Sequence, residues 1–372
     1  MNSSWYRALA ASLLVLTTQA GFSAEHRQRT YELIDLGTLP GATGSTASGI
    51  NNLGEVTGES NANVFVFSHG RIAPLTAPEL TLRNSSSAAI NDVGQVLGSG
   101  CCVPGPLSFL YDYRNHSISV LPLPFTFEFF ALNDRGQITG QGSSSSEEDR
   151  AFVYDPKAGE FTTIDSLADI DSGQFNSGHG INAEGDVTGV SHTNTGTDGH
   201  AFLYRQGTVT DLGTLGGDNS TGNSINRFDQ VTGYSNTKSG SIHAFLYERG
   251  EMIDIGSLGG DDSEGLSIND PGEVVGDSNE AGNGTVRHAF LYRHHRLVDL
   301  NQLINQRSSL AHHVTLNSAV GINNLGEIAA NGSDSSTGQS HAYLLKPVRR
   351  DRDDHGRHGQ NPGRDEERQY TH

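Results

Sequence analysis

INNLGEVTG at residues 50–58 decides the fold, because close versions of this phrase return along the whole chain. The seven copies are INNLGEVTG (50–58), INDVGQVLG (90–98), LNDRGQITG (132–140), INAEGDVTG (181–189), INRFDQVTG (225–233), INDPGEVVG (268–276) and INNLGEIAA (322–330). Their asparagines are 40 to 54 residues apart, which is the length of one four-stranded propeller blade. The phrase therefore predicts a fold of seven similar units.

Two further phrases accompany these copies in a fixed order. The first is aromatic and reads HAFLY at 200–204, 243–247 and 288–292, HAYLL at 341–345, and VFVF, SFLY and AFVY at 64–67, 108–111 and 151–154. The second reads DLGTLPG at 35–41, DLGTLGG at 211–217 and DIGSLGG at 254–260. Short runs of β-branched and aromatic residues between Gly, Asn, Asp and Ser clusters are typical of strands, and no 3.6-residue period persists. The repeat is predicted to be all-β.

Each copy of the INNLGEVTG phrase is predicted to be a tight turn between two antiparallel strands. In the first copy, the Asn51 side chain opens a type I turn and Gly54 adopts the left-handed conformation. Asp229 replaces this glycine in the fifth copy and tolerates the same conformation better than most residues. Pro271 in the sixth copy is disfavoured at its position, so a different turn type is expected there.

Four strands per unit, repeated seven times, predict a seven-bladed β-propeller of four-stranded antiparallel blades over residues 31–347. The chain begins this region with a lone strand at 31–37 and ends it with an aromatic strand at 340–345. We therefore expect the ring to close by pairing of the N- and C-terminal strands. An open solenoid would need polar capping repeats, and neither terminal unit resembles one.

These phrases, in their fixed order, resemble the HAF family of extracellular repeat proteins, which is named for the His-Ala-Phe of HAFLY. The resemblance covers residues 31–347, with degenerate units near Cys101 and Phe125. It implies an exported protein with a repeat fold. It implies no established activity.

Both ends of the chain differ from the repeats. Residues 1–24 combine Arg7, an apolar run and small residues, which indicates a secretory signal peptide with cleavage favoured after Ala20. Residues 348–372 are rich in charge and poor in apolar side chains, so we expect a disordered tail. The predicted location is secreted or periplasmic.

Charge narrows the class of partner. The 372 residues include 24 basic and 43 acidic ones, and the net charge of −19 repels nucleic acid and anionic lipid. After the N-terminal segment, no apolar run is long enough to span a membrane. We expect a monomer that binds an extracellular ligand or protein and no nucleic acid.

Binding residues are expected on the ring face that carries the connections of variable length, because variable loops on a rigid scaffold commonly bind ligands. The candidates there are Asp218, Asn219, Asp261 and Asp262. Their oxygens could hold calcium, although no calcium-loop spacing is present and the same residue types form ordinary turns. We therefore expect no cofactor other than a weak calcium site.

His200, His243, His288 and His341 occupy one equivalent position in four successive units. They should lie about a blade apart, too far to share a metal, so they are predicted to be structural hydrogen-bonding groups and no metal site is expected.

Cys101 and Cys102 are adjacent in a predicted loop of the second unit. In an oxidising compartment they could form a vicinal disulfide.

No serine-hydrolase elbow, zinc-protease motif, phosphate loop or dinucleotide fingerprint occurs in the sequence. The favoured function is a non-catalytic binding or scaffold module. The alternative is a propeller hydrolase or lyase that uses carboxylates on the variable face, such as Asp218, Asp261 and Glu264.

Overall fold

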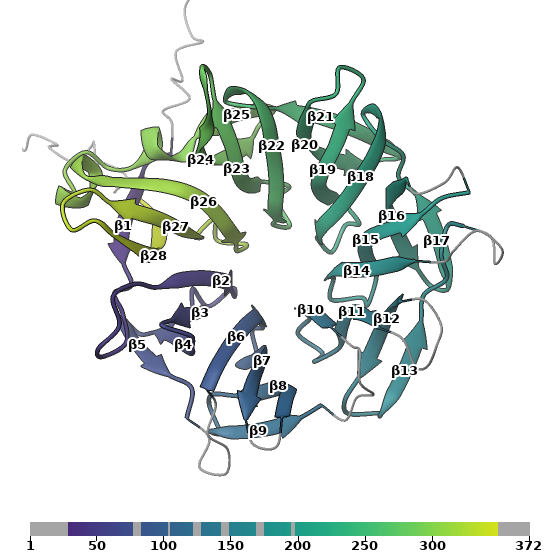
Figure 1. Ribbon diagram of the computed structural model, residues 1–372, viewed down its shortest axis with the longest axis horizontal. Helices are drawn as coiled ribbons and strands as arrows, with labels where there is room; N and C mark the ends of the chain where they lie inside the picture. The colour runs from purple at the N-terminus through teal and green to yellow at the C-terminus, as the bar shows by residue number, and fades with distance from the viewer. Residues whose placement is uncertain are drawn as a thin grey trace, which may run out of the picture.

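The computed structural model describes residues 29–76, 83–102, 105–121, 128–142, 149–168, 175–194 and 198–348. The expected signal peptide and the tail beyond residue 348 lie outside this range. In the described part, the regular structure is antiparallel β-sheet apart from two short 3₁₀ helices. Figure 1 shows the sheets arranged around a common axis, so the fold is all-β and propeller-like.

Four separate four-stranded sheets follow one another along the first part of the chain. The first contains β2 (Thr46–Ile50), β3 (Val56–Ser60), β4 (Asn63–Ser68) and β5 (Arg71–Pro74). The second contains β6 (Arg83–Ile90), β7 (Gln95–Cys102), β8 (Gly105–Asp112) and β9 (Ser117–Val120). The third contains β10 (Glu128–Leu132), β11 (Ile138–Gly142), β12 (Arg150–Asp155) and β13 (Glu160–Thr163). The fourth contains β14 (Asn176–Ile181), β15 (Val187–His192), β16 (Gly199–Arg205) and β17 (Thr208–Asp211).

The next two units are joined. The fifth contains β18 (Gly216–Ile225), β19 (Val231–Thr237), β20 (Ile242–Glu248) and β21 (Glu251–Gly256). The sixth contains β22 (Gly259–Ile268), β23 (Val274–Glu280), β24 (Asn283–Arg293) and β25 (Arg296–Asp299). A single parallel bridge, Ile242 with Asp262, links them into one eight-stranded sheet.

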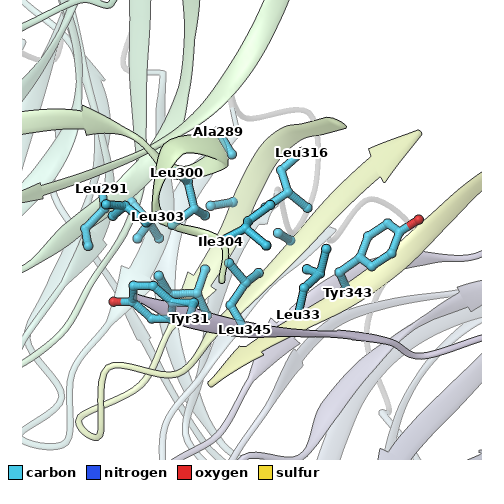
Figure 2. Close-up of a cluster of buried hydrophobic side chains, with 14 of the residues drawn as sticks. Tyr31, Leu33, Ala289, Leu291, Leu300, Leu303, Ile304, Leu316, Tyr343 and Leu345 are labelled. Carbon is cyan, nitrogen blue, oxygen red and sulfur yellow. The ribbon is translucent and has the colours of Figure 1, made fainter. Parts of the chain in front are cut away.

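The last sheet combines the two ends of the described chain. Its strands are β26 (Val314–Ile322), β27 (Ile328–Asp334), β28 (Gln339–Pro347) and β1 (Tyr31–Asp35). β1 pairs antiparallel with β28, with Leu33 opposite Leu345. The side chains of Tyr31 and Leu33 are buried in the largest apolar cluster, beside Tyr343 and Leu345 (Figure 2). The N-terminal strand is therefore held by core packing as well as by backbone hydrogen bonds.

The segment before β26 is partly helical. It contains the 3₁₀ helices η2 (Leu300–Leu303) and η3 (Ser309–His312). Leu303 and Ile304 are buried in the same cluster as Tyr31, and the Asn305 N–H donates to the Tyr31 carbonyl at 2.8 Å. Burial of these apolar side chains makes the segment part of the core that supports β1.

The predicted turn chemistry is present. The Asn51 side-chain oxygen accepts from the Leu53 and Glu55 amides, and Gly54 has a φ of 74°. Asp229 takes the left-handed conformation with a φ of 59°. The sixth copy keeps the bond from the Gly272 N–H to the Asn269 carbonyl at 3.0 Å, as the other copies do, and its different turn type stays a prediction. The turn needs no amide donor from Pro271, because the Asn269 oxygen still accepts from the Glu273 amide.

The last glycine of the phrase has a structural role in the first unit. The register of β2 on β3 shifts between Ala47 and Gly49, which marks a bulge opposite Gly58. A Cβ atom at Gly58 would lie 2.0 Å from the Thr46 carbonyl oxygen, whereas a Cβ at Gly49 would meet nothing closer than 3.8 Å. The bulge therefore leaves no room for a side chain at Gly58.

Gly58→Ala is expected to destabilise the protein by about 3 kcal/mol, because the main chain of β2 must move to relieve the clash. Gly49→Ala, in the same sheet, is the control and should change the free energy of unfolding by less than about 1 kcal/mol. Chemical denaturation followed by circular dichroism measures both. Equal effects from the two substitutions would contradict this account of the motif.

Candidate functional site

Each repeat places one buried asparagine beside the common axis, at the end of its innermost strand. These residues are Asn51, Asn91, Asn133, Asn182, Asn226, Asn269 and Asn323. Each Nδ2 donates to the main-chain carbonyl of the asparagine in the next repeat, at 2.9 to 3.2 Å. The last of these bonds runs from Asn323 to Asn51, so the series returns to its starting residue.

The remaining hydrogen-bonding capacity of these amides is used within each turn. Asn323 illustrates the pattern: its oxygen accepts from the Leu325 and Glu327 amides, and its Nδ2 also donates to the Glu327 carboxylate at 2.9 Å. Every copy of the phrase has an acceptor side chain, either Glu, Gln or Asp, at its sixth position. The asparagines therefore hold the repeats together and have no free group to offer a ligand.

A cavity of about 410 Å³ lies on the axis against these turns. Its lining includes the residue after each asparagine, and three of those residues are acidic: Asp92, Asp134 and Asp270. Asp92 accepts from the Asn52 amide and side chain at 2.7 and 2.9 Å, and Asp134 accepts from the Asp92 amide at 2.8 Å. Loss of solvent at this mouth and the nearby Asp92 charge raise the pKa of Asp134. The cavity mouth is therefore an acidic, hydrogen-bonded rim.

Exposed apolar side chains lie on the same turns as this rim. They belong to the fourth residue of the INNLGEVTG phrase in five of its copies, and we call this set the apolar arc. Its members, in the order in which the asparagine bonds connect the repeats, are Phe228 (58% exposed), Pro271, Leu325 (59%), Leu53 (59%) and Val93 (46%). The two remaining repeats carry Arg135 and Glu184 here. Five successive repeats thus present apolar groups to solvent beside an acidic opening.

The predicted binding residues lie elsewhere and within strands. Asp218 and Asn219 are in β18, and Asp261 and Asp262 are in β22, where loops had been expected. The Asn219 oxygen accepts from the Gly199 amide at 2.9 Å. Asp262 accepts from the Ile242 amide at 3.3 Å, so both residues link neighbouring repeats.

Asp218 and Asp261 are exposed, and no hydrogen bond among the described residues joins the four candidates. Glu264 accepts from Asn223 at 3.0 Å, and burial raises its pKa. These contacts do not gather the carboxylates of the alternative enzyme hypothesis into a single described cluster.

The repeated histidines are hydrogen-bonded, as predicted. The HAF and DLG phrases meet through them: His200, His243, His288 and His341 contact the carboxylates of Asp211, Asp254, Asp299 and Asp35 at 2.8 to 3.0 Å. The contact between His341 and Asp35 joins the last strand to the first. The aspartate partners were missed in the sequence, although the constant 11-residue spacing within three repeats was a usable signal.

Cys101 and Cys102 end β7, and their backbones pair with Pro106 and Gly105 of β8. Their side chains lie outside the described part of the structure, so the vicinal disulfide stays a prediction.

No family model and no curated protein matches the sequence. Solved structures do match the fold. The extracellular domain of BT4673 from B. thetaiotaomicron matches with a TM-score of 0.52 and 13% identity, over 86% of this chain and 40% of that one. Pyrococcus horikoshii acylaminoacyl peptidase matches with a TM-score of 0.51 and 10% identity, over 82% of this chain and 52% of that one.

This chain thus spans only about half of the length of these neighbours or less. At such low identity the likeness establishes the propeller-like fold alone. In the described residues, no helix has the length and apolar character needed to cross a bilayer.

Proposed function

We propose that this protein is an exported, closed, seven-bladed β-propeller of the HAF type that acts as a non-catalytic binding module. Closure is supported by the β1–β28 pairing and by the hydrogen bond from Asn323 back to Asn51. Seven blades are supported by the seven copies of the phrase, each of which contributes one asparagine to the axial series.

The apolar arc beside the acidic rim is the observation that carries the binding function. Soluble proteins seldom expose contiguous apolar groups without a partner, and such patches commonly mark protein interaction sites. The turns of the arc follow one another around the axis because the asparagine bonds hold adjacent repeats together. This site is built by the tight turns, and the four candidates on the variable face are not needed for it.

The chemistry of the rim specifies the partner. Asp92, Asp134 and Asp270 favour a cationic group at the cavity mouth, and the net charge of −19 attracts basic partners. The partner is therefore a protein segment that places a Lys or Arg side chain in the axial mouth and apolar side chains on the arc. Arg227 lies over the Phe228 ring, at 4.6 Å from the ring centre, and contacts Asp270 at 3.5 Å. Arg227 thus neutralises the charge of Asp270, and the negative charge that is left on the rim belongs to Asp92 and Asp134.

A displayed random-peptide library, selected on the mature protein, tests this function. Enriched peptides should combine a Lys or Arg with neighbouring apolar residues. Leu53→Ser combined with Leu325→Ser should weaken binding of those peptides at least tenfold, because both side chains lose apolar contact with the ligand.

Val120→Ser is the matched control, since Val120 is 52% exposed but lies on the outer strand β9. Binding by the double variant at wild-type strength, or enrichment of acidic peptides, would contradict the proposal. Turnover of a polymer that Asp261→Ala abolishes would instead favour the hydrolase alternative.

A further inference from the structure

A separate polar cluster lies within the sixth repeat. It brings together Glu280 at the end of β23, His288 in β24 and Asp299 at the end of β25. One ligand atom from each residue lies within 4.8 Å of the other two. The His288 Nδ1 is 3.1 Å from Glu280 Oε1 and 3.0 Å from Asp299 Oδ2. We propose that these three side chains bind a divalent metal ion of the zinc class, through one imidazole nitrogen and two carboxylate oxygens.

The proton count at this cluster favours a metal. His288 Nδ1 can carry only one proton, whereas two carboxylates approach it. A single N–H cannot make two good hydrogen bonds, and the two negative charges repel each other. A divalent cation between the three atoms would compensate both carboxylates.

The fifth repeat shows that the fold does not require the third group. There, His243 contacts only Asp254, through both carboxylate oxygens at 2.9 and 3.0 Å. Thr237 occupies the position of Glu280, since the two residues make equivalent parallel bridges with Leu215 and Leu258. The second carboxylate is therefore an addition to a His–Asp pair that is stable without it.

The surroundings orient Asp299 for a ligand. Its Oδ1 accepts from the Asn301 amide and side chain at 2.8 and 2.9 Å, which leaves Oδ2 directed at His288. Such outer hydrogen bonds commonly fix the direction of a metal-binding carboxylate. In the fifth repeat, the equivalent oxygen is Asp254 Oδ1, and among the described residues the only backbone amide that donates to it is that of Gly256.

The distances and exposure also suit a metal. Zinc bonds to nitrogen and oxygen are roughly 2.0–2.2 Å, so ligand atoms in a tetrahedral site are about 3.3 Å apart and small side-chain shifts suffice. Glu280 is 43% exposed and Asp299 is 9% exposed. The open side next to Glu280 gives an entry path and room for water as the fourth ligand.

Zinc titration by isothermal calorimetry on mature protein without a polyhistidine tag tests the proposal, with cobalt absorption as a second readout of coordination. Glu280→Thr, which copies the fifth repeat, should bind one zinc fewer per chain than wild type and lose the corresponding cobalt absorption. Glu280→Gln, which keeps the side-chain size, should do the same. Other histidines contribute equally to all variants, so the difference isolates the cluster.

Asp254→Asn, in the pair that lacks a third group, is the matched control and should bind as much zinc as wild type. Circular dichroism and thermal melting should show that Glu280→Thr folds normally, since the fifth repeat carries Thr237 at the equivalent position. Equal zinc stoichiometry and affinity in wild type and Glu280→Thr would overturn the proposal. The proposal would also be overturned if Asp254→Asn lowered the amount of bound zinc as much as Glu280→Thr does.

Discussion

Asn323→Ala is expected to lower the free energy of unfolding by about 3–4 kcal/mol, because it removes four hydrogen bonds at a position that is only 3% exposed. The substitution leaves the Asn51 carbonyl and the Leu325 and Glu327 amides without their partner. Buried polar groups that lose a partner cost more than the bond itself contributes. Urea unfolding followed by circular dichroism measures the change.

Two comparisons sharpen this experiment. Asn63 is exposed and makes one bond to the Asn61 carbonyl, so Asn63→Ala should cost less than about 0.5 kcal/mol. In a closed ring, Asn323→Ala should cost as much as Asn133→Ala, since both residues bond across to the next repeat. If Asn323→Ala cost clearly less than Asn133→Ala, the bond from the last repeat to the first would be missing and the ring would be open there.

Leu33→Ala is expected to destabilise the protein by about 3 kcal/mol through loss of apolar burial and creation of a cavity. Leu33 is 4% exposed and belongs to the cluster that joins β1 to β28 and to the segment around Leu303 (Figure 2). The other three strands of this sheet, β26 to β28, come from the C-terminal part of the described chain. The substitution therefore weakens the contact between the N-terminal and C-terminal strands. Thermal and chemical unfolding measure the loss.

Glu32→Ala, on the same strand, is the control for Leu33→Ala. Glu32 is exposed and lies opposite Lys346, so its replacement should change the free energy of unfolding by less than about 0.5 kcal/mol. A small effect of Leu33→Ala, equal to that of Glu32→Ala, would mean that the N-terminal strand does not contribute to the stability of the folded ring.

The strands and turns could be predicted because they depend on local chemistry. Short runs of β-branched and aromatic residues, Asn at the turn start and Gly in the left-handed position act within a few residues of one another. The second role of the asparagines, their bonds to the next repeat, was missed. The apolar arc was also visible as unusual Leu, Val and Phe residues in a turn, a place where polar residues are more common.

The candidate carboxylates were placed in loops because the sequence does not reveal where a strand gains extra residues. β18 and β22 extend through Asp218 and Asp261 because register shifts near their starts let them continue pairing with β19 and β23. The polar atoms of Asn219 and Asp262 then meet backbone amides of the preceding repeat. Such contacts depend on how repeats pack.

The sequence by itself determined the all-β class, the repeat and the turns, since the strands and turns follow from residues close together in the chain. Only the tertiary structure decided which atoms of different repeats meet, as in the axial asparagine series and in the acidic rim with its apolar arc. The physical reason is that hydrogen bonds and charge contacts depend on separations of a few ångströms. Residues 40 or more positions apart reach those separations only once the sheets have packed around the axis.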